Sequence, residues 1–339
     1  MMLTTHVPAV QALLAAALGE GRSQRLCQQL ELPVGLPAAG PGRSSRAELA
    51  TALTVALFGD VQDRVPLAAE YVADLQRAGR KLVLDHGALR TVAAPCGALP
   101  AGDAAFRRLL EPLGFEVVGV YPLPKLGMTG RAYAHRDLPE GIAQFFVSEL
   151  HPERFSAPFQ AAVQRVVGHS RDPLSASCAE LLDALQRDGS LPLAAAARLL
   201  LGLVSCFDRQ HDEPTIADYE RLLEESPEMA WIATEGNAYN HATDRVACVE
   251  TTAAEQRRLG RPIKDRVEVS SSGRVRQTAF RAGLVRRGFR SEGGREERLV
   301  PGSFHEFISR AALPAGGLDL SFDSGNATAI FAMTGVPGS

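Results

Sequence analysis

Cysteines are few in this sequence and lie far apart. The 339 residues contain five, at positions 27, 96, 178, 206 and 248, and no two of them form a Cys-x-x-Cys pair. An odd number at wide spacing argues against a disulfide framework, and the absence of a close pair argues against a cysteine-rich zinc knot. A reducing compartment, the cytoplasm, is therefore the expected location.

Long apolar runs and an excess of one charge are absent as well. The longest apolar stretches, residues 7–18 and 191–206, are shorter than the roughly 20 residues that cross a bilayer. Lys and Arg number 36 against 39 Asp and Glu, which gives a formal net charge of -3. We therefore expect neither a membrane nor a nucleic acid as a partner. The basic run at 281–290 is interpreted as a solvated strand or loop face, with an anion-binding patch as the alternative.

The chain alternates between helical and strand-like regions. Apolar residues recur every four positions over 46–79, after Ser45 as a candidate N-cap, and the spacing is helical again in 157–228. The two regions that follow these have strand composition with one short helix each. The predicted organisation is α+β: a helical N-terminal layer (1–80), a first βαβββ module (81–156), a helical insertion (157–228) and a second βαβββ module with a closing segment (229–339).

The two modules are predicted to contain the same elements in the same order. In the first, strands are expected at 81–92, 115–121, 131–136 and 142–150, with a helix at 103–113. In the second, strands are expected around residue 241 and at 267–270, 277–285 and 303–309, with a helix at 252–259. The last segment, 318–333, is expected to close an edge of the sheet or to line the mouth of a pocket.

Each module begins with a His-x-x-x-Arg sequence. The first copy is His86 to Arg90 and the second is His241 to Arg245. In a strand, residues four apart share a face and lie about 13 Å from one another. Two such strands facing each other would offer two imidazoles to a metal ion and two guanidinium groups to an anion. A single copy arises easily by chance, so the repetition is what supports a site.

Paired βαβββ modules with a ligand on the first strand of each resemble the vicinal oxygen chelate superfamily, which includes glyoxalase I. Three motifs look more narrowly like those of the 2-oxoadipate dioxygenase/decarboxylase family, also called hydroxyglutarate synthase. They are Leu-Asp-His-Gly-Ala-Leu-Arg at 84–90, Thr-Glu-Gly-Asn-Ala-Tyr-Asn-His at 234–241 and Val-Pro-Gly-Ser-Phe-His-Glu-Phe at 300–307. The resemblance spans roughly residues 80–310 and implies a half-barrel site formed by both modules.

The resemblance implies an Fe(II) ion, or another divalent metal, held by His86, His241 and Glu306, with Arg90 as the substrate-binding and catalytic arginine. Two imidazoles and one carboxylate leave positions open for a chelating substrate and O₂, as in non-haem Fe(II) oxygenases. A structural zinc site would instead fill four positions, usually with cysteine. A carboxylate among apolar strand neighbours is costly unless it binds a metal or a partner. His305 is expected on the opposite face.

Four further residues are weaker candidates. Glu149 lies on the strand that corresponds to the strand of Glu306, where glyoxalase-type relatives supply a fourth metal ligand, but it could equally be a solvated strand-end carboxylate. Arg245 is either a second substrate clamp or a surface charge. Tyr239 and Arg281 are candidates for lining the pocket.

The resemblance implies an enzyme that decarboxylates and oxygenates a 2-oxo dicarboxylic acid, most specifically 2-oxoadipate to 2-hydroxyglutarate and CO₂. One molecule then supplies both substrate parts, so the expected ligands are a 2-oxo acid and O₂. Two alternatives stay open. One is a glyoxalase-like isomerase or lyase with a different metal, and the other is a metal-free protein that binds a small molecule. Metal retention and O₂ uptake would separate the three.

Overall fold

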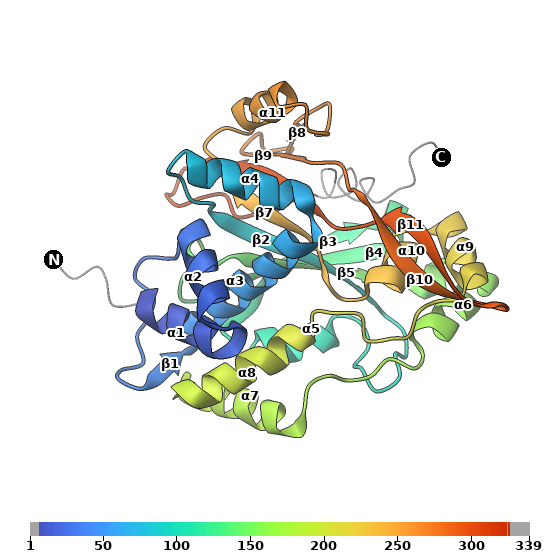
Figure 1. Cartoon of the computed structure of the whole chain (residues 1–339), viewed down its shortest axis with the longest axis horizontal. Helices are drawn as coiled ribbons and strands as arrows, with labels where there is room; N and C mark the ends of the chain where they lie inside the picture. Colours follow the sequence, from blue (N-terminus) through green and yellow to red (C-terminus); the bar gives the residue numbers. More distant parts are fainter. Residues whose placement is uncertain (1–6, 324, 326–339) are drawn as a thin grey trace.

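A mixed sheet of eight strands lies at the centre of the molecule (Figure 1). The structure, a computed structural model, describes residues 7–323 and residue 325. The strands of the sheet are β2 (Leu84–Val92), β3 (Phe115–Leu123), β4 (Met128–His135), β5 (Gln144–Leu150), β7 (Tyr239–Arg245), β8 (Glu268–Val269), β9 (Val275–Ala279) and β12 (Phe304–Arg310). Two smaller pairs join β1 (Arg43–Ser45) to β6 (Ser190–Pro192), and β10 (Leu284–Ser291) to β11 (Gly294–Pro301).

Helices precede, connect and cover these strands. They are α1 (Val7–Leu18), α2 (Glu20–Gln29), α3 (Arg46–Arg64), α4 (Pro66–Arg77), α5 (Ala104–Leu110), α6 (Ala157–Val167), α7 (Ala176–Asp188), α8 (Leu193–Ser205), α9 (Ile216–Glu225), α10 (Pro227–Glu235) and α11 (Val249–Arg258), with short 3₁₀ turns at Pro124–Leu126 and Pro152–Arg154. Within residues 7–323, none of them combines the length and the hydropathy that a membrane crossing requires.

The strand order shows the internal repeat directly. Across the sheet it is β3-β4-β5-β2-β7-β12-β9-β8, so the first strands of the two modules, β2 and β7, lie together in the middle. Each pairs in parallel with the last strand of its own module, β5 or β12, and the two pair with each other antiparallel. The predicted α+β fold with paired βαβββ modules is therefore confirmed, and its repeat brings the two histidine-bearing strands side by side.

One face of the sheet is covered by helices. Helix α3 packs on β7, α4 packs on β12, and α8 packs on both α1 and α3. Aromatic contacts fill this layer: Tyr71 of α4 meets Phe307 of β12, and Phe145 of β5 meets Phe207 just after α8. Since helices from 1–80 and from 157–228 share this layer, the division of the chain at those boundaries stays a prediction.

Three predicted elements differ from the structure. The helix expected over 46–79 is broken into α3 and α4 at Pro66, whose ring removes a backbone donor and blocks continuation of the preceding helix. The strand expected over 277–285 is two strands, because β9 ends at Ala279 and β10 belongs to a separate hairpin with β11. Residues 229–235 form part of α10, so the first strand of the second module starts only at Tyr239.

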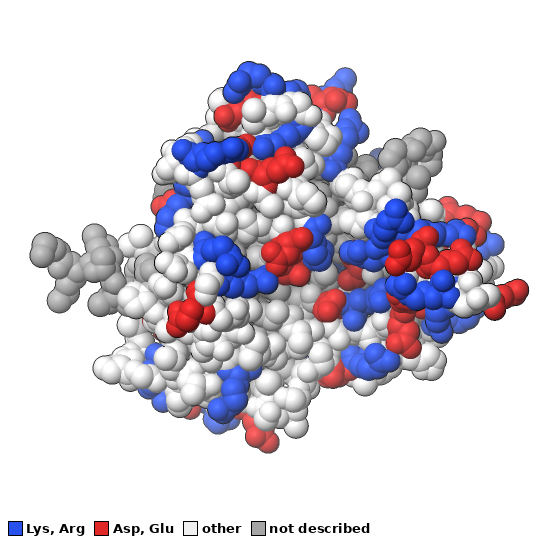
Figure 2. Space-filling model, in the orientation of Figure 1, with Lys and Arg blue, Asp and Glu red and all other residues white. Residues whose placement is uncertain are grey.

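The hairpin β10–β11 contains most of the basic run at 281–290. Arginines on both of its strands pair with acidic residues of neighbouring elements: Arg287 with Glu235 at 2.6 Å, and, on the second strand, Arg298 with Glu220 at 2.6 Å. Figure 2 shows blue and red side chains interleaved over this part of the visible face. Within the run itself, Arg281 and Arg287 have carboxylate partners, on a strand surface of the kind expected from the sequence.

Buried histidines are expected to make the fold sensitive to acid. His135 of β4 is fully buried, with Nε2 2.9 Å from the Leu113 carbonyl, and burial lowers its pKa to about 4. In the unfolded chain the imidazole of His135 is protonated near pH 6.5, but in the folded chain only near pH 4. Between these two pH values the free energy of unfolding should therefore fall by about 1.4 kcal/mol for each pH unit of acidification. Urea unfolding between pH 7 and pH 4 measures this slope. The slope for His135→Gln should be smaller than that of wild type by about that amount. Equal slopes for the two proteins would contradict the prediction.

Candidate active site

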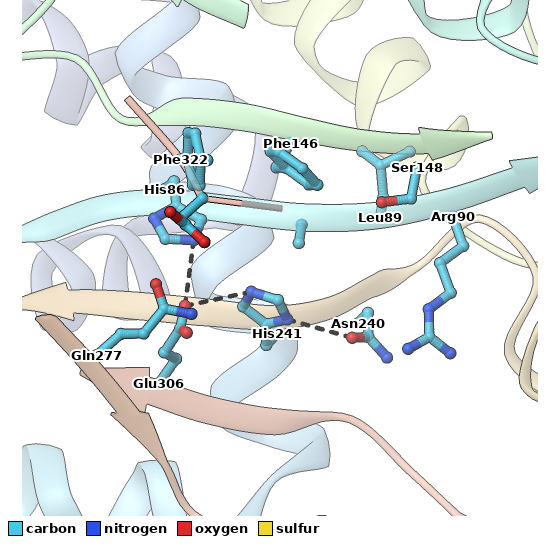
Figure 3. A pocket seen from close by; sticks show the side chains of 12 residues that line it. His86, Leu89, Arg90, Phe146, Ser148, Asn240, His241, Gln277, Glu306 and Phe322 are labelled. Carbon is cyan, nitrogen blue, oxygen red and sulfur yellow. Dashed lines mark hydrogen bonds and ion pairs between the residues drawn. The ribbon is translucent and has the colours of Figure 1, made fainter. Parts of the chain in front are cut away.

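Three side chains that can bind a metal converge on the face of the sheet opposite the helices. His86 of β2, His241 of β7 and Glu306 of β12 offer ligand atoms that all lie within 4.8 Å of one another. Glu306 Oε2 lies 3.2 Å from His86 Nε2 and 3.4 Å from His241 Nε2 (Figure 3). The strand pairing causes this convergence, since the three residues lie on adjacent strands of one sheet.

The surroundings of Glu306 fit a bound cation. The residue is 1% exposed, and its Oε1 has no hydrogen-bond partner among the described residues. Oε2 accepts a hydrogen bond of 2.6 Å from the Thr243 hydroxyl. Burial alone would raise the pKa of Glu306, but His241 and His86 outweigh it and hold this pKa below its usual range. A buried carboxylate with an unused oxygen beside two imidazoles is a donor set that suits a divalent metal.

Both histidines are preceded by a residue that lies in a β-bulge. Between β2 and β7 the register shifts twice, and Asp85 and Asn240 are the residues left without a partner. Each contacts the Nδ1 atom of its neighbouring histidine: Asp85 Oδ1 at 2.8 Å from His86, and Asn240 Oδ1 at 3.2 Å from His241. This arrangement leaves both Nε2 atoms directed at Glu306 and fixes the imidazole orientation that a metal ligand needs.

Asp85 is itself held by two arginines. It is fully buried, accepts hydrogen bonds from Arg310 Nη2 at 2.9 Å and Nε at 3.0 Å, and accepts one from Arg245 Nε at 2.6 Å. Burial would raise its pKa, but Arg310 and the bond to His86 keep the pKa of Asp85 well below the usual range. Arg245 is therefore committed to Asp85 and to the Glu140 carbonyl, and it does not line the pocket as a substrate clamp would.

Arg90 lies in the pocket on the far side of His241 from Glu306 (Figure 3). It is 1% exposed, and its Cζ lies 5.1 Å from the centre of the Trp231 ring, a cation–π contact. Burial lowers the pKa of Arg90 to about 10, an effect that Glu228 opposes, so the guanidinium stays charged at neutral pH. A buried guanidinium in a pocket wall is suited to holding a carboxylate.

The pocket links these groups. Besides the residues above, it is lined by Phe146, Ser148, Gln277, Phe322 and Asp323. Phe322 packs on Phe146 and on His86, with ring centres 4.7 Å and 4.9 Å apart. The beginning of the segment predicted at 318–333 therefore lines the pocket, while residue 324 and residues 326–333 lie outside the described residues.

Comparison with known proteins identifies the chain. A family model described as 2-oxoadipate dioxygenase/decarboxylase matches residues 49–321. The chain belongs to this family. The resemblance predicted from the three motifs is therefore confirmed. No curated protein matches the chain.

Solved structures show how widely the fold of this dioxygenase/decarboxylase family is shared. A protein from Ralstonia eutropha JMP134 assigned to the glyoxalase superfamily is 56% identical with a TM-score of 0.91, over 93% of this chain and 98% of that one. The hydroxyglutarate synthase from Oryza sativa, in complex with 2-oxoadipate, is 18% identical with a TM-score of 0.68, over 90% and 97% of the two chains. The hydroxyglutarate synthase from Pseudomonas putida, also with 2-oxoadipate, is 20% identical with a TM-score of 0.56, over 98% and 74%.

Glu149 does not reach the candidate metal centre of this family member. Its Oε1 accepts from the Asp103 backbone N–H at 2.9 Å, and its Oε2 pairs with Arg131 at 2.8 Å. The strand register explains the error. In β12, His241 pairs with Phe304, and Glu306 is two residues further along the strand. In β5, His86 pairs with Gln144, and the residue two further along is Phe146. The position expected to supply a fourth ligand thus contains an apolar ring.

Tyr239 is also placed differently from the prediction. Its ring lies on the helix-covered face, 5.8 Å from the ring of Phe145 and 6.0 Å from that of Phe207, and it does not line the pocket. It occupies the space beside Gly87, where a Cβ atom would overlap the tyrosine ring. The glycine after His86 therefore permits β2 and β7 to pair closely.

Substitution at Gly87 tests this packing. Gly87→Ala is expected to lower the free energy of unfolding by about 1–3 kcal/mol, because the new methyl group must displace the Tyr239 ring. Urea denaturation measures the change. In a Tyr239→Ala background the same substitution should cost less, and an equal cost in both backgrounds would contradict the proposed overlap.

The remaining candidate, Arg281, lies away from the pocket and pairs with Asp265 at 3.2 Å on the surface. His305 faces the helices, with its ring centre 5.4 Å from that of Tyr71, as expected for a residue on the opposite face from Glu306.

Sequence inspection missed several residues that line or support the site in this family member. Asp85 and Asn240 had a detectable signal, because each directly precedes a repeated histidine. Thr243, Gln277 and Ser148 had none, since their positions depend on strand register rather than on any local motif.

Proposed function

We propose that the protein is a non-haem Fe(II)-dependent dioxygenase that decarboxylates and hydroxylates a 2-oxo dicarboxylic acid. The substrate we propose is 2-oxoadipate, which with O₂ gives 2-hydroxyglutarate and CO₂, a balanced reaction that requires no other co-substrate. The observation that supports this most is the combination of a His86, His241 and Glu306 donor set with a buried arginine, Arg90, in one pocket. The three donors suit a metal and the arginine suits a carboxylate.

The donor set indicates which ion and which chemistry the pocket is suited to. Held by these two imidazoles and one carboxylate, Fe(II) would offer coordination positions for a 2-oxo acid and for O₂ and would pass to O₂ the electrons that the oxidised substrate gives up. Three protein donors leave the remaining coordination positions of the ion open. Phe146 occupies the place of a fourth protein ligand, which favours a three-donor oxygenase site over a four-ligand glyoxalase-like isomerase site.

The other pocket residues position the substrate and exclude water. Asp85 and Asn240 hold the histidine rings, and Thr243 fixes the Glu306 carboxylate. Arg90 binds the substrate carboxylate that the metal does not hold. It thereby sets which carbon of the substrate lies next to the metal. Phe146 and Phe322 cover the site with apolar surface, which strengthens these electrostatic contacts.

The test uses purified protein loaded with Fe(II) under nitrogen. Addition of 2-oxoadipate and air should consume O₂ and release CO₂ and 2-hydroxyglutarate in equal amounts, whereas His86→Ala should show only background. The proposal fails if wild type and His86→Ala give the same rates. Turnover of a 2-oxo compound without O₂, supported by Zn²⁺ or Ni²⁺, would indicate an isomerase or lyase instead.

A further inference from the structure

The side chains of two adjacent residues, Asn240 and His241, both face the pocket. In a regular strand, adjacent side chains point to opposite faces. The register between β2 and β7 shifts at this point: Ala88 pairs with His241 and Leu89 with Tyr239, so Asn240 is left unpaired in the bulge. The bulge turns the Asn240 side chain into the pocket, as bulges beside active sites commonly do.

The contact with His241 determines which end of the Asn240 amide faces the pocket. The Nε2 atom of His241 is directed at Glu306, which leaves Nδ1 as the protonated nitrogen of the neutral ring. This Nδ1–H donates to Asn240 Oδ1, 3.2 Å away. The amide nitrogen must therefore point the other way. Asn240 is 2% exposed, and its Nδ2 has no hydrogen-bond partner among the described residues.

A buried donor without a partner is unfavourable unless a ligand provides the acceptor. Figure 3 shows the order Glu306, His241, Asn240, Arg90 along the pocket, so the amide and the guanidinium lie on the same side of the metal ligands. Neutral and positive donors at one end of a pocket favour an anion there.

The internal repeat provides a direct contrast. The residue equivalent to Asn240 in the first module is Asp85, which is also in a bulge and also contacts its histidine. Asp85 faces Arg310 and Arg245 and does not line the pocket, so its charge is neutralised within the protein. An aspartate at position 240 would hold His241 equally well but would place a negative charge in the pocket with Arg90.

We propose that Asn240 is a specificity-determining residue whose amide N–H, together with Arg90, binds the substrate carboxylate that lies farther from the metal. This inference rests on the proposed function and extends it. Asn240 holds His241 with its oxygen and the substrate with its nitrogen, so one side chain links metal binding to recognition of a dicarboxylate. A neutral amide is required because the carboxylate of an aspartate would pair with Arg90 and repel the substrate.

The test compares two acids of equal chain length, 2-oxoadipate and 2-oxohexanoate, which differ only in the terminal carboxylate. Calorimetric titration of Fe(II)-loaded protein under nitrogen gives the affinity for each, and the ratio of the two affinities measures recognition of the second carboxylate. In Asn240→Asp this ratio should fall at least about tenfold relative to wild type, and in Asn240→Ala it should fall by an intermediate factor. The affinity for 2-oxohexanoate should change much less.

The controls are the metal content of each variant and the variant Asp85→Asn, which changes the equivalent residue of the first module. Asn240→Asp keeps an oxygen for His241 and should retain iron as wild type does, whereas Asp85→Asn should weaken iron binding without changing the ratio. An unchanged ratio in iron-loaded Asn240→Asp would overturn the assignment of Asn240 while leaving the proposed function intact. Wild type that binds neither acid would overturn the proposed function and this assignment with it.

Discussion

Glu306→Gln is expected to abolish metal retention and O₂ consumption while leaving the fold intact. The amide has the shape of the carboxylate but carries no charge, and it cannot supply the anionic oxygen that the two imidazoles face at 3.2 Å and 3.4 Å. Loss of an outer-shell partner already weakens metal binding by about 10–100-fold, so loss of this ligand should cost more than about 100-fold. Metal analysis after dialysis measures it.

Thermal unfolding separates loss of the metal from loss of the fold. A metal that binds the folded chain raises the melting temperature of wild type, and this rise should vanish in Glu306→Gln. Without metal, the variant should still unfold in one cooperative transition, at a lower temperature than metal-free wild type, because the imidazoles that hold the pKa of Glu306 low then face a neutral amide. Glu149→Gln is the matched control, since its partners are Arg131 and the Asp103 backbone, and it should retain metal. Equal metal loss in both variants would contradict the assignment.

The repeat in the sequence was sufficient to predict the architecture. His-x-x-x-Arg occurs at the start of two similar modules, and period-2 geometry places such a histidine on one face of a strand. The structure brings β2 and β7 together at the middle of the sheet, so His86 and His241 meet as expected. Glu306 joins them because β12 is the parallel neighbour of β7. These positions depend on topology, which the repeat determines.

The errors arise where the exact strand register decides which face a side chain occupies. Glu149 was aligned with Glu306 by its place on an equivalent strand, but the pairing shows an offset of three residues, an odd number that reverses the face. Tyr239 was assigned to the pocket, although the bulge at Asn240 puts it on the helix-covered side. Bulges have no reliable local signature, so neither position could be obtained from alternation alone.

Asp85 and Arg310 form a fully buried ion pair behind His86. Both side chains are 0% exposed, and Arg310 also donates to the carbonyl oxygens of Asp319 and Ser321, at 2.8 Å and 2.9 Å. The pair therefore joins the histidine on β2 to the segment that contains Phe322, whose ring lies 5.1 Å from Arg310 Cζ and 4.9 Å from the ring of His86. Removing one partner leaves the other charge buried without compensation.

Asp85→Asn should consequently destabilise the protein and weaken its metal site together. We expect a loss of about 3–5 kcal/mol in the free energy of unfolding, because Arg310 then faces a neutral amide. We also expect metal affinity to fall by about 10–100-fold, since His86 loses its charged acceptor at Nδ1. Urea unfolding of the metal-free protein measures the first effect, and competition with a chelator measures the second.

A double variant distinguishes a coupled pair from two independent packing residues. Asp85→Asn combined with Arg310→Met removes both charges, so the stability cost should be clearly smaller than the sum of the two single costs. Metal affinity should not recover in the double variant, because the charged acceptor for His86 is still missing. Strictly additive stability costs would show that Arg310 does not depend on Asp85, and recovered metal affinity would show that the charge on Asp85 does not position His86.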